Sequence, residues 1–303
     1  MKAFWEECLD HLKDSGIEDA GREFCLLGAA VCACSYEEFR FGNAGETLTA
    51  LQKEKLWTFV QRRAQHEPFA KIVGKASFWK SYFFTGPQTL DPRPESELFL
   101  EVLLKIFRPK DLPLSFLDLG TGTGCLLLSS LMEYPFARGL GVDRSSKALE
   151  IAQKNAHFWG LTERCSFEQG NWNESVNGLF DVILSNPPYI RDNETLPPDV
   201  LFDPPEALFA GPDGLNAYRE IFAKILKNMH QQSLIFVEIG FQQSLAVQEI
   251  AMRSGLFGQG VFDDFQNIPR LVVFGREPDL LRISPSGEIK KLFEGREQED
   301  SLF

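Results

Sequence analysis

"FLDLGTGTGC", residues Phe116–Cys125, sets a run of strand-forming apolar residues directly before three glycines at every second position. Glycine lets the backbone turn sharply and approach a ligand closely, and a helical pattern, "GCLLLSSLMEY", follows at once. The spacing is G-x-G-x-G and not the G-x-G-x-x-G that presents a helix N-terminus to a pyrophosphate. The stretch therefore predicts a strand, a glycine loop and a helix that bind a nucleoside without a phosphate.

On both sides of this stretch, short apolar runs alternate with helical patterns, which is typical of βαβ units. We expect a mainly parallel sheet with helices on both faces. The expected strands are "LSFLDLG", "GLGVD", "CSFEQG" and "DVILS", followed by Leu234–Gly240, Gly260–Phe265 and Arg270–Arg276.

The first part of the chain has a different pattern. Phe4, Cys8 and Leu12 recur at helical spacing, and Ser35 with Glu38 forms a plausible capping box. We expect a helical domain over residues 1–72, a hairpin or linker over 73–94, a catalytic α/β domain over 95–276 and a polar tail over 277–303. The apolar stripes of the helical domain are expected to pack on each other, with a partner surface as the alternative.

Composition limits the class of protein. The chain has 303 residues, 44% of them hydrophobic, and a net charge of −12, which disfavours a partner held mainly through phosphates. The longest apolar run is too short to span a bilayer, and the N-terminus has no secretion pattern. The six cysteines are scattered and the four histidines lie far apart, so we expect reduced thiols, no metal site and a cytoplasmic protein.

Four polar or aromatic features follow strands that should end at one edge of the sheet, where ligands of open α/β sheets bind. Asp143 could accept hydrogen bonds from a ribose diol, or it could cap the next helix. Trp172 could lie against a purine ring, or it could belong to the core. The remaining two are the loop at Gly120 and the polar end of "DVILSNPPYI" at Asn186.

Together, "LDLGTGTG", Asp143 and "NPPY" resemble the class I methyltransferases that use S-adenosylmethionine. More narrowly, the chain resembles the protein-(glutamine-N5) methyltransferases of peptide release factors, the PrmC/HemK family, over residues 1–276. "PRPESE" (92–97) and "DPPEALFAGPDGLNAYR" (203–219) also match that family. The resemblance implies a Rossmann-like seven-stranded sheet with a small helical N-terminal domain that docks the protein substrate.

The resemblance also implies residue roles. The cofactor would be bound by the glycine loop around its methionine part, by Asp143 at the ribose, by Trp172 at the adenine and by Asn186 facing the methyl group, with Asp118 a further candidate at the ammonium; the loop residues are Gly120, Thr121, Gly122, Thr123 and Gly124. The substrate would be the glutamine of the Gly-Gly-Gln loop of class-1 release factors. It would be held by Asn186, Pro187, Pro188 and Tyr189, of which Asn186, Pro187 and Tyr189 would be catalytic.

These residue types suit the reaction. An amide nitrogen is a poor nucleophile because its lone pair is delocalised, so it must be held in line with the methyl group. The side-chain carbonyl of Asn186 and the backbone carbonyl of Pro187 can each accept one N–H of the substrate amide. Pro188 restricts Pro187 to an extended conformation, and Tyr189 can pack over the amide or position it.

An amino-methyltransferase acting on adenine or guanine of RNA or DNA is the main alternative, because an exocyclic amine presents the same pair of N–H groups. Such enzymes usually carry a basic surface or a target-recognition domain, so the acidic charge favours a release factor and no direct nucleic-acid binding. A cofactor-binding module without catalysis is a third hypothesis, which the intact "NPPY" disfavours.

The sequence departs from the family pattern at several positions. Asn171 stands in place of Asp, Asp91 in place of an apolar residue, Ser96 in place of Thr, Asp203 in place of Glu and Pro269 in place of an acid. Asn171 keeps an oxygen acceptor but loses the charge.

Overall fold

A seven-stranded sheet forms the centre of the larger part of the computed structural model, which describes residues 2–42, 47–283 and 289–291. The strand order is β5-β4-β3-β6-β7-β9-β8, in which β3 to β7 run parallel and β9 runs antiparallel to both β7 and β8. The strands are β3 (Ser115–Leu119), β4 (Arg138–Asp143), β5 (Cys165–Gln169), β6 (Phe180–Ser185), β7 (Met229–Glu238), β8 (Phe257–Asp263) and β9 (Pro269–Gly275). The predicted mainly parallel, seven-stranded sheet is confirmed.

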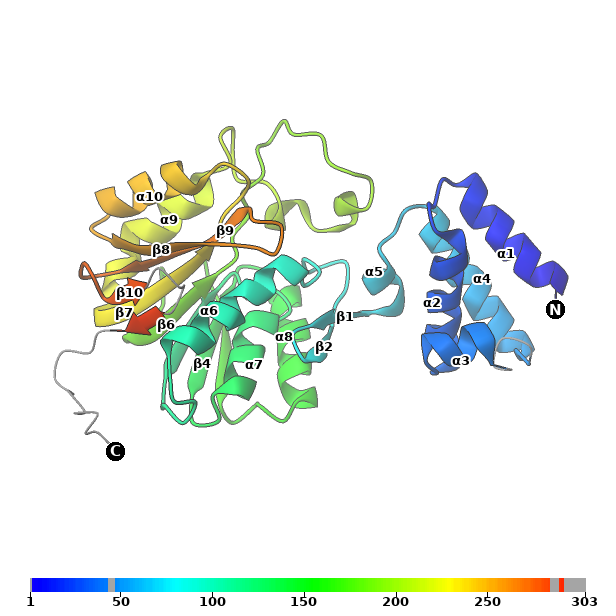
Figure 1. Ribbon diagram of the computed structural model, residues 1–303, viewed down its shortest axis with the longest axis horizontal. Helices are drawn as coiled ribbons and strands as arrows, with labels where there is room; N and C mark the ends of the chain where they lie inside the picture. Colours follow the sequence, from blue (N-terminus) through cyan, green and yellow to red (C-terminus); the bar gives the residue numbers. More distant parts are fainter. Residues whose placement is uncertain (1, 43–46, 284–288, 292–303) are drawn as a thin grey trace.

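Helices cover both faces of this sheet, as the alternating pattern predicts (Figure 1). One face carries α6 (Leu98–Ile106), α7 (Cys125–Glu133) and α8 (Ser146–Phe158), and the other carries α9 (Asn216–Lys224) and α10 (Ser244–Arg253). Within β7, Leu234 and Phe236 join the first core, and Ile235 and Val237 join the second. A strand buried on both faces must be apolar at every position, which explains the unbroken "LIFV" run.

The order of the strands places the site. The chain enters the sheet at β3, moves outward through β4 and β5, and then returns to β6 on the other side of β3. The connections therefore diverge beside β3, and a crevice forms at the carboxyl ends of β3, β4 and β6. The glycine loop, Asp143 and Asn186 follow those three ends.

The N-terminal part is helical and has its own core. Its helices are α1 (Lys2–Asp14), α2 (Ala20–Cys32), α3 (Tyr36–Phe41), α4 (Ala50–Ala64) and α5 (Phe69–Val73). Phe24, Leu27, Leu56 and Val60 are buried against one another, so the apolar stripes do pack together. The Ser35–Glu38 capping box is confirmed, with reciprocal hydrogen bonds of 2.8 and 3.2 Å.

Figure 1 shows this helical part beside the sheet, joined to it by α5 and a short hairpin of β1 (Lys75–Phe78) and β2 (Ser81–Phe84). No helix in the described part of the chain is long and apolar enough to cross a membrane.

The stretch expected to be a polar tail contains a hairpin. β10 (Leu281–Ile283) pairs antiparallel with β11 (Ile289–Lys291), and Leu280, Leu281 and Ile289 are buried in the core beside α6. Burial of these few apolar side chains holds the hairpin on the sheet. They are difficult to detect in the sequence because the residues around them are polar. The rest of the expected tail, residues 284–288 and 292–303, lies outside the described residues.

Candidate functional site

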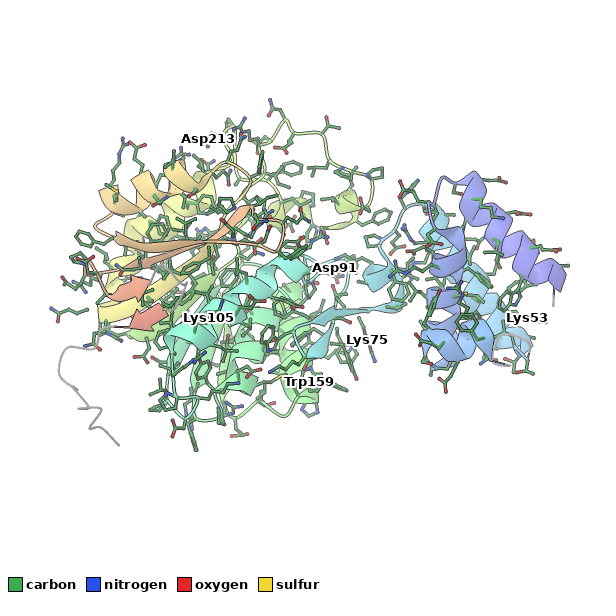
Figure 2. The ribbon with its side chains drawn as sticks, in the orientation of Figure 1. Lys53, Lys75, Asp91, Lys105, Trp159 and Asp213 are labelled. Carbon is green, nitrogen blue, oxygen red and sulfur yellow. The ribbon has the colours of Figure 1, made fainter. Side chains whose placement is uncertain are left out.

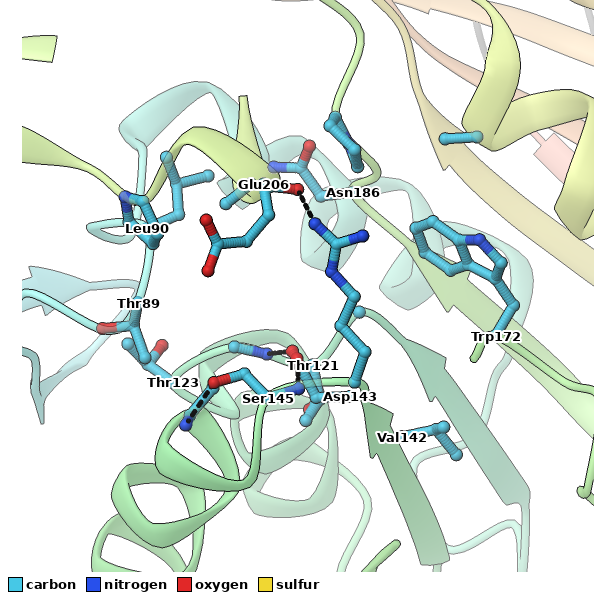
Figure 3. A pocket seen from close by; sticks show the side chains of 18 of the residues that line it. Thr89, Leu90, Thr121, Thr123, Val142, Asp143, Ser145, Trp172, Asn186 and Glu206 are labelled. Carbon is cyan, nitrogen blue, oxygen red and sulfur yellow. Dashed lines mark hydrogen bonds between the residues drawn. The ribbon is translucent and has the colours of Figure 1, made fainter. Parts of the chain in front are cut away.

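A cavity of about 290 Å³ lies at the carboxyl ends of β3, β4 and β6. Most of the predicted ligand-binding residues line it: Gly120, Thr121, Gly122, Thr123, Asp143, Trp172, Asn186 and Pro188. Figure 3 shows Thr121, Thr123, Asp143, Trp172 and Asn186 around this one space. Residues with up to three strands between them in the sequence therefore line one cavity.

The glycine loop between β3 and α7 folds back over the end of β4. Gly120 N and Thr121 N donate hydrogen bonds to Val142 O at 2.9 and 3.0 Å. Gly120, Gly122 and Gly124 have φ values of +74°, +53° and +78°, which side chains disfavour. A Cβ at Gly122 would meet only the Gly120 carbonyl oxygen, 4.0 Å away, so the loop leaves open space for a ligand here.

Asp143 ends β4 and is held by backbone groups. Its Oδ2 accepts a hydrogen bond from Gly122 N and its Oδ1 accepts one from Ser145 N, both at 2.9 Å. Burial raises the pKa of Asp143 above its ordinary value, and the two backbone N–H groups oppose this rise. The carboxylate thus contacts the next helix as well as the cavity, and each oxygen keeps further acceptor capacity for a ligand hydroxyl.

Trp172 lies across the cavity from α8. Its indole Nε1 donates to Glu220 Oε2 at 2.8 Å, and its backbone has a φ of +50°. A Cβ placed on Gly120 would lie 3.3 Å from the Trp172 ring, which shows how closely loop and ring approach. The indole packs partly against the second core and also lines the cavity, so the part of it that faces the cavity can contact a flat ring.

Asn186 is oriented by a chain of side chains. Its Nδ2 donates to Ser96 Oγ at 3.0 Å, and Ser96 Oγ donates in turn to Glu238 Oε2 at 2.5 Å. The Tyr189 hydroxyl donates to the other oxygen of Glu238 at 3.4 Å. Ser96 and Glu238 are buried, and burial raises the pKa of Glu238 to about 7, while the Ser96 hydrogen bond opposes this rise.

Some predicted residues do not line the cavity. Pro187 is buried, Gly124 caps α7, and Tyr189 turns its hydroxyl to Glu238. Asp118 is fully buried and accepts a hydrogen bond from Thr121 Oγ1 at 2.7 Å, so it supports the loop from beneath; its burial raises its pKa to about 7.

Sequence reasoning missed two parts of the site. One is the hydrogen-bonded link from Asn186 through Ser96 to Glu238, whose signal is an acid at the end of the apolar run "LIFVE". The other is Arg144, which lines the cavity and donates to Glu206 O at 3.1 Å.

Two family models match the chain, one in its helical N-terminal part and the other in its α/β part. Residues 5–74 match the PrmC N-terminal domain, and residues 91–200 match the methyltransferase small domain. The α/β part is thus a class I methyltransferase, and its methyl donor is S-adenosylmethionine. The cavity offers an open space at Gly122, a carboxylate at Asp143 and an indole at Trp172, which are groups of the kinds that can hold such a nucleoside.

Curated relatives match nearly the whole chain. The release factor glutamine methyltransferase of Caulobacter vibrioides is 37% identical over 278 residues, which are 90% of this chain and 96% of the relative. That of Cereibacter sphaeroides is 38% identical, over 86% of this chain and 93% of the relative. That of Agrobacterium fabrum is 35% identical, over 88% of this chain and 93% of the relative. With this identity along both of its parts, and with Asn186 and Pro188 of "NPPY" lining the cavity, the chain belongs to the release factor glutamine methyltransferase family.

Proposed function

We propose that this protein is a cytoplasmic enzyme that transfers a methyl group from S-adenosylmethionine to the side-chain amide nitrogen, N5, of the glutamine in the Gly-Gly-Gln motif of class-1 peptide chain release factors. The family relationship supports the substrate. One observation supports the chemistry most directly, namely that the amide of Asn186 lies at the cavity with its N–H side already bonded to Ser96. All six cysteines are free thiols, in agreement with a reducing compartment.

The hydrogen-bonded link fixes which end of the Asn186 amide is available. While Glu238 is ionised, Ser96 gives its single hydroxyl proton to that carboxylate, so the Ser96 oxygen can only accept from Asn186. If the amide were reversed, Oδ1 would face an oxygen with no proton to offer. The side-chain carbonyl of Asn186 is therefore left to accept an N–H of the substrate.

A second acceptor is needed because a primary amide presents two N–H groups. We assign it to the backbone carbonyl of Pro187, whose conformation Pro188 restricts. Tyr189, anchored at Glu238, would position the substrate amide from the same side. With both N–H groups held, the nitrogen lone pair can be turned toward the methyl group, and a strong general base is not required, since the proton can leave after methylation.

The cofactor side of the site is assigned to the cavity wall. When bound, S-adenosylmethionine supplies a methyl group activated by its sulfonium. We assign its ribose to Asp143 and its adenine to the face of Trp172. Its methionine part is assigned to the loop residues Gly120, Thr121, Gly122 and Thr123, which Gly124 joins to α7, with Asn186 facing the methyl group.

The helical N-terminal part is assigned to docking of the release factor, and we expect no direct contact with nucleic acid. The test uses labelled S-adenosylmethionine with a release factor, with a copy whose loop glutamine is changed to alanine, and with RNA and DNA. We expect label only in the release factor with the unchanged glutamine. Equal labelling of both copies would refute the glutamine assignment, and transfer to nucleic acid alone would support the base-modifying alternative.

A further inference from the structure

A buried cluster of two cations and two anions lies behind the cavity wall, at the junction between α5 and the sheet. Its members are Lys71, Asp91, Arg93 and Asp203. Figure 2 shows Asp91 at this junction. Lys71, Asp91 and Asp203 expose at most 8% of their side chains, so these three charges are almost fully removed from water, whereas Arg93 is 37% exposed.

Lys71 is the centre of the cluster. It lies on α5, and its Nζ is 3.1 Å from Asp91 Oδ1 and 2.9 Å from Asp203 Oδ1. The same ammonium donates to the carbonyl of Gly86 at 2.8 Å and to that of Thr89. An ammonium has three protons, so these four acceptors use all of its hydrogen-bonding capacity.

Two acceptors of Lys71, Thr89 and Asp91, lie in one segment that lines the cavity, and a third, Asp203, directly precedes a second such segment. We call residues 88–93 the first wall and residues 204–210 the second wall. Asp91 lies in the first wall, and Asp203 directly precedes the second. Asp203 also accepts hydrogen bonds from Arg93 and, at 3.3 Å, from the backbone N–H of Asp91. Lys71 thus joins two walls that are more than 100 positions apart in sequence.

We infer that Lys71 is a positioning residue of the cofactor cavity, through which the helical N-terminal part holds the two walls together. The second wall has a separate tether on its solvent side, where Arg144 donates to the carbonyl of Glu206 at 3.1 Å. That bond is exposed, whereas the pairs of Lys71 with Asp91 and Asp203 are buried and therefore much less screened. The inner anchor therefore determines whether the second wall is in place before ligand binds.

Removal of the Lys71 charge leaves two buried carboxylates beside a single arginine. Asp91 would lose the cation that most opposes the upward shift of its pKa by burial. Breaking a buried pair from one side is strongly destabilising because the remaining charge has no partner. Since Asp203 directly precedes Pro204, we expect loss of the Lys71 charge to loosen the second wall first.

The test is Lys71→Met, measured in two ways. We expect the Kd of S-adenosylhomocysteine to rise roughly tenfold or more, which corresponds to about 1.4 kcal/mol. We also expect faster amide exchange in the second wall of the cofactor-free protein, for example at Ala210, whose N–H is bonded to Ile190 O at 2.8 Å. Lys80→Met is the control for loss of a paired lysine away from the cavity, since the exposed Lys80 pairs with Glu133, which does not line the cavity and keeps Lys110 as a partner.

Asp203→Asn gives an independent variant in case Lys71→Met does not fold. It loosens the second wall but leaves Lys71 paired with Asp91, so the same two changes are expected in weaker form. The inference would be overturned if a folded variant bound S-adenosylhomocysteine with wild-type affinity and showed wild-type amide exchange. It would also be overturned if amide exchange became faster by the same factor throughout the sheet. The inference rests on the cofactor cavity of the proposed function but not on its protein substrate. A wild-type protein that binds S-adenosylhomocysteine but leaves release factors unmethylated would refute that function alone.

Discussion

Replacement of Ser96 by alanine tests whether the Asn186 amide is oriented by the link to Glu238. The change removes the acceptor for Asn186 Nδ2 and the donor to Glu238 Oε2, bonds of 3.0 and 2.5 Å. A neutral hydrogen bond contributes about 0.5–1.5 kcal/mol, so loss of the bond that orients the Asn186 amide should lower kcat roughly 3- to 10-fold. The KM for S-adenosylmethionine should change little, because the cofactor residues keep their contacts.

The assay is single-turnover methyl transfer to a release factor at saturating cofactor, with two comparison variants. Ser96→Thr keeps the hydroxyl and should retain most of the rate. Ser129→Ala also removes a buried serine hydroxyl, but that hydroxyl has no hydrogen-bond partner within the part of the chain that the structure describes, so the rate should not change. A wild-type rate in Ser96→Ala would refute the orienting role.

Three further predictions concern the same cavity. Asn186→Ala should lower the rate by about 10²-fold or more while cofactor binding stays measurable by calorimetry, and an unchanged rate would remove Asn186 from the reaction. The pKa of Glu238, about 7 in the folded protein against an ordinary 4.5, implies a stability contribution that is present at low pH and lost as the pH rises through 7. Between about pH 5 and pH 8 the wild type should therefore lose on the order of 2–3 kcal/mol more unfolding free energy than Glu238→Gln in urea titrations, and parallel curves would contradict this. Gly122→Ala should raise the Kd of S-adenosylhomocysteine roughly tenfold by filling the cavity. Gly160→Ala, with a similar positive φ of +67° and open space around it, is its control for backbone strain, and equal Kd values would speak against the cavity assignment.

The sheet and the convergence of its ligand residues were predictable from the sequence because both depend on local patterns. The unbroken apolar runs indicate strands buried on both faces, and parallel strands bring their carboxyl ends to one edge. Gly120 and Asn186 follow such runs, and Asp143 and Trp172 follow the neighbouring strands β4 and β5 of the same parallel set, so their meeting required no knowledge of side-chain contacts.

The parts that were not predicted depend on contacts between distant residues. Ser96 and Glu238 are 142 positions apart, and no motif around either residue indicates that the two are in contact. Lys71 reads as an ordinary polar residue of a helix, although its ammonium is buried between two aspartates. The hairpin at Leu281 and Ile289 was hidden in the same way, because only the core beneath it explains its order.

The central claim is that the methyl group is delivered to a glutamine side-chain amide of a release factor. It is tested most directly by incubating purified protein with S-adenosylmethionine and an unmethylated class-1 release factor, followed by fragmentation mass spectrometry of the peptide that carries the Gly-Gly-Gln loop. We predict the added mass of one methyl group on the glutamine side chain, and its absence when the Asn186→Ala protein is used for the same short time. A methyl group at any other residue, or none on the release factor while RNA or DNA is labelled, would contradict the account.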